Sequence, residues 1–514
     1  MDAQNGRAGE PESGAPFRVH TVRGLFWSGL QRTGGQAIGL ATFIVLSRLL
    51  PPSDFGVLAL ANVYLLVVLL LVEQGVNQAV IQRHSLSPEH LDAAFSVSLG
   101  LATVLTLLTL VLAAPLSRLF DEPTLEPVLR WLSLTVLLSG LRATQTAVLQ
   151  RQMRFRELAV RTTFAEGLGG VVGIAMALGG LGVWSLVGQA IARALAGVFV
   201  LWRVSVWRPH LRVALGPVRE VTRFGLPVLG DRLVALVQGK ADDLVIGLVL
   251  GATALGYYAV GYRMLTYATM LLAGTFQAVS LPVLSRLQHD LPRFRHTFLT
   301  MVHYLALAAF PVFVGIAFVA PEIVPVLFGP NWSPSIPVMQ VLALVGAAKV
   351  LPLATATALV AQGRPGVQLR LNLVTTALAV IGFVSVVGRG IVAVASVHLI
   401  VALLAIPLHA GLLHSVFDIR PSVYFRAIRT AGVGVVLMGA VLLPLTTVWS
   451  RPQASLLWLV VAIVVGAATY LGATYLLGRS SYDRARRALQ EGILAGPGAV
   501  ATDPEPEGLA RPSP

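Results

Sequence analysis

Long apolar segments run the length of the chain and leave few folds open to it. A helix needs ~20 apolar residues to cross a bilayer core, and the 514-residue sequence contains fourteen such segments. A lipid interior offers the backbone no hydrogen-bond partners, so these segments must be helices. The sequence therefore predicts an all-α polytopic membrane protein with about 14 transmembrane helices. They cover residues 24–49, 55–81, 93–114, 126–149, 162–182, 184–202, 222–250, 254–285, 297–319, 322–360 (broken early at Pro330 and Pro334), 367–388, 391–414, 428–449 and 454–478.

The charge content supports this class and excludes others. Hydrophobic residues make up 55% of the chain and charged residues only 12%, whereas soluble domains average about 25% charged. A soluble enzyme, a disordered protein and a disulfide-rich secreted domain are therefore excluded. The chain has no cysteine, which removes disulfides, thiolate metal sites and cysteine nucleophiles.

The net charge of +14 would suggest nucleic acid binding in a soluble protein, but here it follows from topology. The connections alternate in charge: 26 of the 38 Lys and Arg residues lie on one side of the predicted membrane and five on the other. Basic loops stay cytoplasmic. We therefore expect a multi-pass cell (plasma or inner) membrane protein with both termini in the cytoplasm, membrane lipids around it, and no nucleic acid partner.

An internal repeat indicates two lobes. Leu49–Tyr64 aligns with Val249–Met264 at an offset of 200 residues, which pairs Gly56 with Gly256, and later pairs follow at offsets of 206 and 208. Chance similarity among apolar segments is the alternative. An even number of helices in each copy makes the repeats parallel, facing each other across a cavity. The predicted parts are a cytoplasmic N-tail (1–23), an N-lobe of six helices (24–203), a cytoplasmic linker (204–221), a C-lobe of six helices (222–416), two extra helices (417–478) and a disordered cytoplasmic tail (479–514).

Ionisable residues inside the predicted helices are the candidate functional residues, because each costs roughly 2.5–3.5 kcal/mol near the bilayer centre. Arg32 lies about 12 Å into the first helix, on a face of small and polar residues that is not expected to face lipid. Arg263 lies in the eighth helix beside Tyr262 and Tyr267. Arginine donates two hydrogen bonds to two phosphate oxygens, so these residues predict an anionic headgroup in the cavity. The alternative is that they pair with carboxylates to lock the lobes. The full set is Arg32, Glu73, Arg142, Glu166, Arg193, Asp231, Arg232, Lys240, Asp242, Asp243, Arg263 and Lys349.

Six further candidates, in three pairs, each leave two interpretations open. Lys240 and Asp243 either contact substrate or pair with each other one turn apart. Arg142 and Arg193 either line the cavity or form gate pairs. Glu73 and Glu166 are possible protonation sites or helix-packing residues. No Walker A motif and no paired histidine spacing occur in the sequence, and isolated histidines such as His398 are expected to be packing residues. We therefore expect no cofactor, no metal and no enzymatic activity.

Several motifs resemble the Wzx-type oligosaccharide flippases, in the polysaccharide-transport branch of the multidrug/oligosaccharidyl-lipid/polysaccharide (MOP) superfamily. The resemblance covers roughly residues 20–420 with the order of the motifs kept. The motifs are Ala79–Arg83 (AVIQR), Leu91–Phe95 (LDAAF), Leu149–Ala159 (LQRQMRFRELA), Gly182–Gln189 (GVWSLVGQ), Leu250–Tyr258 (LGATALGYY) with Tyr262 and Arg263, Leu281–Gln288 (LPVLSRLQ), Ala320–Gly329 (APEIVPVLFG) and Ala361–Pro365 (AQGRP).

The resemblance implies a flippase that moves a polyprenyl-diphosphate-linked oligosaccharide to the outer leaflet by alternating access. It implies that Arg32 and Arg263 bind the diphosphate, and it makes a polysaccharide polymerase and glycosyltransferases candidate partners. With no nucleotide site, a proton or sodium gradient, or consumption of substrate outside, must drive transport. The alternatives are a cation-coupled multidrug antiporter of the same superfamily, which would need a more acidic pocket, and a non-transporting scaffold for polysaccharide assembly.

Overall fold

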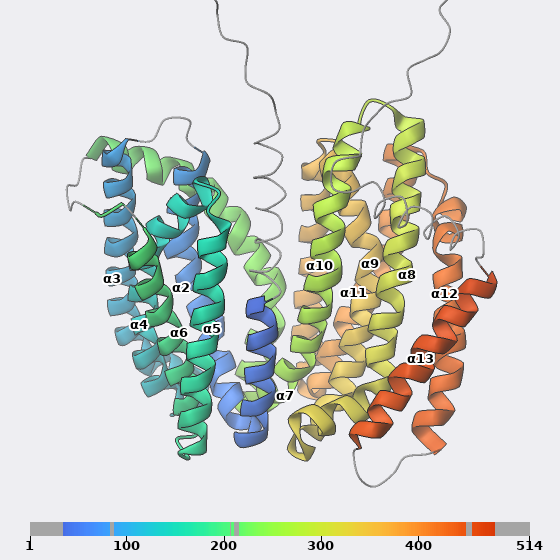
Figure 1. Cartoon of the computed structure of the whole chain (residues 1–514), viewed down its shortest axis with the longest axis horizontal. Helices are drawn as coiled ribbons and strands as arrows, with labels where there is room; N and C mark the ends of the chain where they lie inside the picture. The colour runs from blue at the N-terminus through green and yellow to red at the C-terminus, as the bar shows by residue number, and fades with distance from the viewer. Residues whose placement is uncertain (1–33, 83–86, 206, 210–214, 449–454, 478–514) are drawn as a thin grey trace, which may run out of the picture.

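The protein is described by a computed structural model that covers residues 34–82, 87–205, 207–209, 215–448 and 455–477. Every regular element in this part of the chain is a helix (Figure 1). Twelve of its helices are long and apolar enough to cross a membrane, and a shorter apolar helix spans Gly34–Leu49. The predicted all-α polytopic membrane protein is confirmed, while the count of about 14 spans stays a prediction. The predicted tails, 1–23 and 479–514, lie outside the described residues.

The helices follow one another with short connections. After Gly34–Leu49 come α2 (Pro52–Gln82), α3 (Pro88–Leu119), α4 (Leu125–Arg151), α5 (Phe155–Leu178), α6 (Val183–Val204), α7 (Leu215–Arg286), α8 (Leu291–Ile323), α9 (Ile336–Ala361), α10 (Pro365–Val386), α11 (Ile391–Phe417), α12 (Pro421–Val448) and α13 (Leu456–Leu477). Short π and 3-10 turns, η1 (Val324–Phe328), η2 (Pro330–Ser335) and η3 (Val387–Arg389), lie between some of them.

The 72-residue α7 is two helices in one element. Its backbone breaks at Gly251, where φ is 82°, a conformation that glycine adopts without the steric cost of a Cβ. The break separates the two helices that the sequence predicts at 222–250 and 254–285. It also lies 200 residues after Pro51, where helix Gly34–Leu49 gives way to α2. The two halves of α7 therefore repeat helix Gly34–Leu49 and α2.

Two boundaries differ from the predicted ones. The predicted linker 204–221 overlaps α7, which already begins at Leu215. The predicted helix 322–360 breaks at Pro330 and Pro334 as expected, within η2, but α8 continues to Ile323 and α9 begins only at Ile336. Between them the chain turns at Gly329, where φ is 103°, and prolines in η1 and η2 remove backbone donors that a continuous helix would need.

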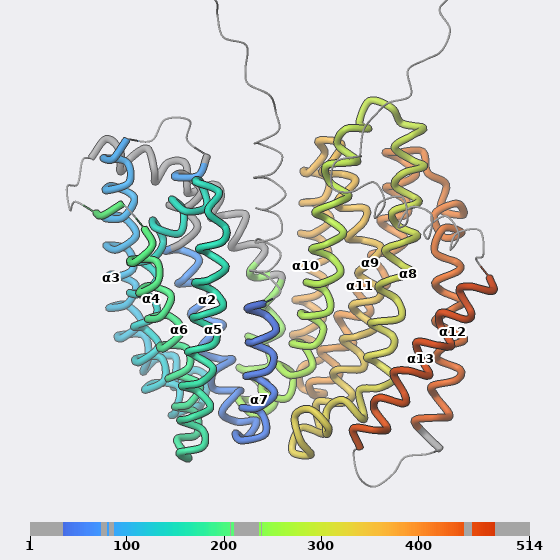
Figure 2. Tube along the Cα trace, in the orientation of Figure 1, coloured from blue at the N-terminus to red at the C-terminus, as the bar shows by residue number. Residues whose placement is uncertain are grey.

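The helices form two groups (Figures 1 and 2). The first contains helix Gly34–Leu49 and α2–α6, and the second contains the later half of α7 with α8–α11. The two extra helices, α12 and α13, pack on the outer side of the second lobe against α8 (Figure 1). Met438, Leu442, Ala462 and Tyr470 form that contact, and the Tyr470 hydroxyl donates to the carbonyl of Leu307 at 2.9 Å.

Helix Gly34–Leu49 packs between the lobes through small residues. A Cβ on Gly35 would lie 2.9 Å from Cγ2 of Thr162, and one on Gly170 would lie 2.5 Å from Oγ1 of Thr42. Such contacts let helix backbones approach closely. The part of the small, polar face that the structure describes therefore packs against α5, which agrees with the expectation that this face does not point to lipid.

The lobes touch at one end through a reciprocal backbone contact. A Cβ on Gly56 would lie 1.8 Å from the carbonyl oxygen of Ala252, and a Cβ on Gly256 would lie 2.1 Å from that of Pro52. Gly256 and Ala252 lie 200 residues after Gly56 and Pro52, so the offset of the repeat converts one contact into the other and an approximate two-fold axis passes between them. The pairing of Gly56 with Gly256 in the sequence repeat therefore corresponds to a real contact between the lobes.

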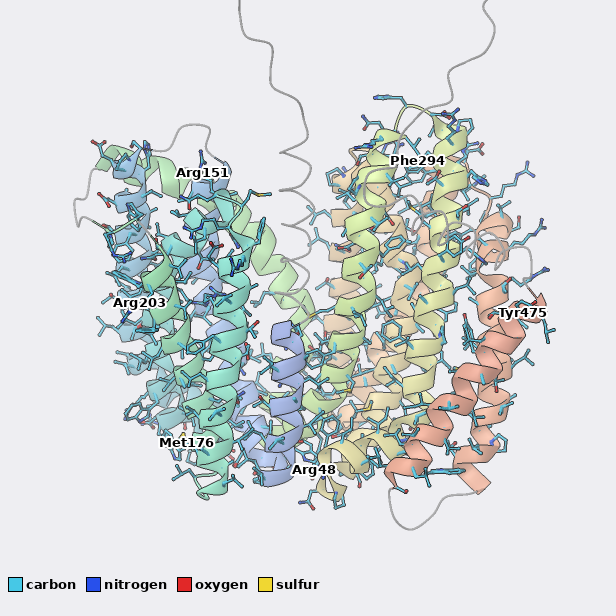
Figure 3. All side chains as sticks on the ribbon, in the orientation of Figure 1. Arg48, Arg151, Met176, Arg203, Phe294 and Tyr475 are labelled. Carbon is cyan, nitrogen blue, oxygen red and sulfur yellow. The ribbon has the colours of Figure 1, made fainter. Side chains whose placement is uncertain are left out.

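Aromatic packing and hydrogen bonds seal this end further. Trp332 is fully buried, donates from Nε1 to the carbonyl of Ser47 at 2.7 Å and packs edge-on against Phe55 at 5.2 Å. Arg48 donates from Nε to the carbonyl of Leu327 at 2.9 Å. In Figure 3, Arg48 lies at this end, whereas Arg151 and Phe294 lie at the other. We call this end, with Arg48 and Trp332, the closed end.

Candidate substrate cavity between the lobes

A cavity of about 340 Å³ lies between the lobes. One wall comes from helix Gly34–Leu49 and α2, with Gln36, Phe43 and Asn62, and the other comes from both halves of α7. Three of the predicted site residues, Lys240, Asp243 and Arg263, line it; the full lining is Gln36, Phe43, Phe55, Leu58, Ala59, Asn62, Val63, Lys240, Asp243, Ala259, Val260, Tyr262, Arg263, Thr266, Tyr267 and Met270. Arg32 lies outside the described residues, as do the side chains of Glu73, Asp231 and Arg232.

Arg263 presents an available guanidinium to this cavity. It is exposed, and its Cζ lies 4.1 Å from the centroid of the Phe43 ring. Such a cation–π contact is worth about 0.5–2 kcal/mol and leaves the N–H donors at the guanidinium edge free. Among the described residues no carboxylate forms an ion pair with Arg263. The predicted lock between Arg263 and an acidic residue is therefore not seen in this part of the chain.

Lys240 and Asp243 form an ion pair. Lys240 Nζ lies 2.5 Å from Asp243 Oδ2 and 5.5 Å from the centroid of the Tyr262 ring. The predicted pairing of the two residues is therefore confirmed, and both line the cavity, while their contact with substrate stays a prediction. The pair is neutral as a unit, so Arg263 gives the described lining its net positive charge.

Behind this pair lies a buried carboxylate from the predicted set, Asp242, whose partners the sequence did not indicate. Asp242 is only 1% exposed. It accepts a hydrogen bond from the Tyr258 hydroxyl at 2.8 Å, and its Oδ2 lies 3.0 Å from Nε2 of His398. His398, expected to be a packing residue, is instead the partner of a carboxylate 156 positions away. No local spacing could have indicated that contact.

Arg142 and Arg193 line a separate pocket of about 300 Å³ inside the N-lobe. Arg161, which the sequence placed in a loop, joins them there, and Nη1 of Arg193 lies 3.4 Å from Oε1 of Glu166. Both residues line this pocket and not the cavity between the lobes, and their alternative role as gate pairs stays a prediction. Asn62 lines both the N-lobe pocket and the cavity between the lobes, which makes the two spaces neighbours.

Together these residues can bind an anion between two helical lobes. Guanidinium and ammonium groups supply charge-assisted hydrogen bonds, and the Phe43, Tyr262 and Tyr267 rings supply apolar surface. Within the described residues no group of three or more His, Cys, Asp or Glu side chains could hold a metal ion. The fold and the charged cavity define a two-lobed membrane protein of the transporter type.

Comparison with solved structures agrees with this class. The fold matches the inward closed conformation of the lipid II flippase MurJ, with a TM-score of 0.72 at 13% identity, over 88% of this chain and 99% of that one. It also matches an inward-facing multidrug resistance MATE family transporter of the MOP superfamily, with a TM-score of 0.60 at 15% identity, over 76% of this chain and 99% of that one.

Sequence comparison assigns the chain to a family. A sequence model described as polysaccharide biosynthesis protein matches residues 45–337, more than half of the chain, and the chain belongs to this family. Relatives include the succinoglycan biosynthesis transport protein ExoT of Rhizobium meliloti, 28% identical over 63% of this chain and 65% of that protein. The lipopolysaccharide biosynthesis protein WzxC of Escherichia coli is 24% identical over 70% and 74%. The teichuronic acid biosynthesis protein TuaB of Bacillus subtilis is 25% identical over 83% and 88%. The chain thus spans just under two thirds of ExoT, and the predicted Wzx-type MOP membership is confirmed.

Proposed function

We propose that this protein is a flippase that moves a polyprenyl-diphosphate-linked oligosaccharide from the cytoplasmic to the outer leaflet by alternating access. The observation that carries the proposal is the cavity between the lobes, which brings Arg263 and Lys240 of α7 against Phe43 and Asn62 of the other lobe. The names of the relatives, a succinoglycan transport protein and a lipopolysaccharide biosynthesis protein among them, support a glycan substrate. The fold shared with a lipid II flippase supports lipid-linked cargo.

The diphosphate would bind to the edge of the Arg263 guanidinium. The Phe43 ring holds that guanidinium from one face, so its edge donors remain available to two phosphate oxygens. Lys240 is already paired with Asp243 and adds less net charge. The lipid tail would remain in the bilayer beside the lobes. Arg142 and Arg193, in the pocket that shares Asn62, would offer the substrate a second cationic region.

The conformation suits the first half of such a cycle. The lobes touch at the closed end, where helix Gly34–Leu49 finishes and α2 begins. By the charge rule this end faces outward in the cell membrane, with both termini in the cytoplasm, so the cavity would load from the cytoplasmic side. Transport would need no cofactor and no enzymatic step. A proton or sodium gradient, or removal of the substrate outside by a polysaccharide polymerase supplied by glycosyltransferases, would drive it.

The drug-antiporter alternative has weaker support from the site. A cationic drug needs an unpaired carboxylate in the cavity, whereas Asp243 is paired with Lys240 at 2.5 Å and Arg263 leaves the described lining positive. The likeness to a MATE transporter at 15% identity concerns the fold alone. A non-transporting scaffold would tolerate loss of Arg263.

The test uses a strain in which the gene for this protein is deleted and the protein is supplied from a plasmid, either unchanged or with Arg263 replaced. Losing a charge-assisted contact worth about 1.5–3 kcal/mol should lower export about 10- to 150-fold in Arg263→Ala, with partial recovery in Arg263→Lys. Surface polysaccharide and lipid-linked precursor inside the cell are measured together. Arg130→Ala is the matched control, because that exposed arginine pairs with Glu126 outside the cavity. Unchanged export in Arg263→Ala would refute the diphosphate assignment, and ethidium efflux that rises with the protein would favour the antiporter.

A further inference from the structure

The second lobe contains a cavity of its own, of about 380 Å³, bounded by α7, α8, α9, α10 and α11. It is separate from the cavity between the lobes but adjacent to it. Thr269 lines the C-lobe cavity and the next residue, Met270, lines the other. The rings of His398, in the C-lobe cavity, and Tyr262, in the other, have centroids 6.4 Å apart. A substrate held between the lobes therefore has this second space within reach.

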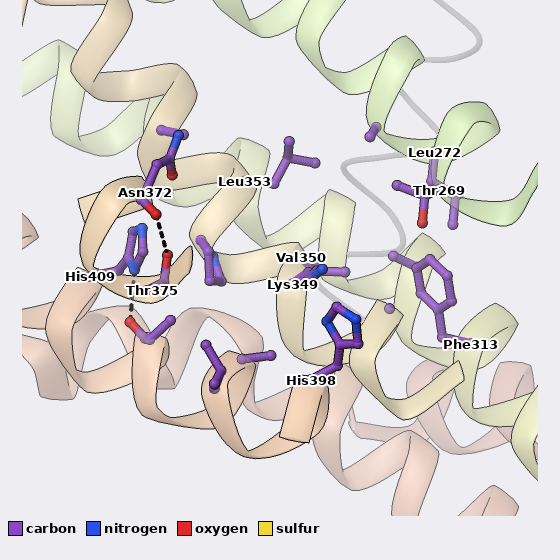
Figure 4. Close-up of a pocket in the computed structure, with 18 of the residues that line it drawn as sticks. Thr269, Leu272, Phe313, Lys349, Val350, Leu353, Asn372, Thr375, His398 and His409 are labelled. Atoms are coloured by element: carbon purple, nitrogen blue, oxygen red, sulfur yellow. Dashed lines mark hydrogen bonds between the residues drawn. The ribbon is translucent and has the colours of Figure 1, made fainter. Parts of the chain in front are cut away.

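Lys349 supplies the only formal charge in the described lining of the C-lobe cavity. Its side chain is exposed to this space, and Figure 4 shows it near the middle of the lining, close to His398. Among the described residues it forms no hydrogen bond or ion pair. Asp242 acts on it electrostatically without a direct contact, and that carboxylate is already held by Tyr258 and His398. An ammonium group in the membrane interior without a direct partner requires a reason.

Two buried acceptors without donors, on His409 and Gln368, line the same cavity, and Figure 4 shows His409 in another part of it than Lys349. His409 is 4% exposed; its Nδ1 lies 2.7 Å from the carbonyl of Ala405, and its Nε2 has no partner. When Nδ1 donates to that carbonyl, Nε2 of the neutral ring is an acceptor. Gln368 donates from Nε2 to Asn372 Oδ1 at 2.8 Å, which leaves its buried Oε1 without a donor. Both lining residues therefore carry an acceptor that a hydroxyl or amide donor of a ligand would satisfy.

The remaining wall limits the ligand further. Leu272, Phe313, Val350 and Leu353 give the cavity apolar surface, which suits the C–H faces of a ring. Small-molecule sites have volumes of roughly 300–1,000 Å³, so a cavity of about 380 Å³ accepts a single sugar residue better than a whole oligosaccharide. A neutral sugar would satisfy the acceptors and leave Lys349 desolvated without an anion, which is unfavourable. A sugar with one carboxylate satisfies both.

We infer that the C-lobe cavity is a carbohydrate subsite for an acidic sugar residue, a uronate or similar monocarboxylate. The carboxylate pairs with Lys349, and ring hydroxyls donate to His409 Nε2 and Gln368 Oε1. The inference rests on the proposed flippase function and deepens it, because the diphosphate lies between the lobes while one residue of its glycan enters the C-lobe. It makes the C-lobe cavity a determinant of which glycan is accepted.

The sequence offers a direct test, because Lys240 and Lys349 are the only two lysines in the chain. Reductive methylation with ¹³C-formaldehyde places a reporter on each lysine and keeps its charge. The full-length protein in lipid nanodiscs then gives separate NMR signals, assigned with Lys240→Arg and Lys349→Arg. The probes are D-glucuronate, D-glucose, acetate and inorganic pyrophosphate. We expect glucuronate to shift the Lys349 signal saturably, with a half-saturating concentration about tenfold below those of glucose and acetate.

Substitutions of the two acceptor residues test whether the response needs these specific side chains or only a polar cavity. His409→Phe and Gln368→Leu should each weaken the glucuronate response of Lys349 while that signal remains. The matched control is Ser396→Ala on the same helix as His409, where the exposed hydroxyl bonds only to the carbonyl of Val392. Equal responses to acetate and glucuronate, equal responses to glucose and glucuronate, or no response of Lys349 would each overturn the inference.

Pyrophosphate distinguishes this inference from the proposed function. It should shift Lys240, which lies in the cavity between the lobes with Arg263, more than Lys349. If pyrophosphate shifts Lys240 and glucuronate leaves Lys349 unchanged, the carbohydrate subsite is wrong and the flippase assignment stands. If glucuronate shifts Lys349 but export survives in Arg263→Ala, the subsite stands and the diphosphate assignment is wrong.

Discussion

Trp332 holds the closed end through a hydrogen bond that the chain makes necessary. The Ser47 carbonyl would normally accept from the backbone N–H four residues later, but that residue is Pro51, which has no N–H. The Trp332 indole supplies the missing donor at 2.7 Å from the opposite lobe. The bond exists only while the lobes touch, so Trp332→Phe should weaken the closed end and leave the interior of each lobe intact.

The size of the effect follows from the burial of that carbonyl. Ser47 is 3% exposed, and a buried acceptor left without a donor costs about 1–3 kcal/mol. After opening, water can reach the carbonyl and the cost disappears. The ratio of outward-open to closed protein should therefore rise about 5- to 150-fold. From a starting ratio of 1:99, a rise in the middle of that range brings the open form to about one quarter of the population.

The distance across the closed end measures this ratio. Spin labels at Thr124→Cys, between α3 and α4, and at Arg389→Cys, in η3, report one lobe each, and the absence of native cysteine leaves no background. Electron–electron resonance in nanodiscs should show a longer-distance population in Trp332→Phe. Trp131→Phe is the control, since that side chain is 58% exposed on α4. Identical distance distributions in both variants, with normal thermal unfolding, would refute the role assigned to Trp332.

Two further substitutions test the packing of the described structure. Gly256→Val would place a Cβ 2.1 Å from the carbonyl oxygen of Pro52, which is too close for the backbones to keep their contact. The same spin labels should therefore show the closed end separated. An unchanged short distance would contradict the close backbone approach. Tyr258→Phe removes a donor from buried Asp242 and should lower the free energy of unfolding by about 2–3 kcal/mol, against little change in Tyr304→Phe; equal losses would contradict the bond's importance.

The fold was largely predictable because the bilayer fixes element length and type. Long apolar segments must be helices of about the observed extent, and the repeat predicted two lobes. The turn between α8 and α9 was predictable only as a break at Pro330 and Pro334. Its prolines were visible in the sequence, but the left-handed turn at Gly329, with φ of 103°, depends on how η1 and η2 pack beneath helix Gly34–Leu49.

The site was predictable where contacts are local and obscure where they are not. Lys240 and Asp243 are three residues apart on a helix, so their ion pair follows from helical spacing. The sequence positions of Asp242 and His398, in contrast, do not indicate that these residues are partners. Their contact exists only because the fold brings α11 beside α7. Arg161 was counted with the loop arginines because it lies at a predicted helix boundary, yet α5 begins at Phe155 and carries it into the N-lobe pocket.

Phe43 connects the cavity with the closed end. Arg263 lies over one face of its ring, at 4.1 Å, while the ring packs edge-on against Phe55 at 5.2 Å and Phe328 at 5.7 Å. On α7, Arg263 is seven residues, about 10 Å, from Gly256 in the contact between lobes. An anion that draws the guanidinium away from Phe43 removes about 0.5–2 kcal/mol of cation–π energy from a ring that helps seal the closed end. Substrate binding and opening of the closed end therefore act on the same side chain. A bound substrate can shift the balance between closed and open lobes directly through Phe43.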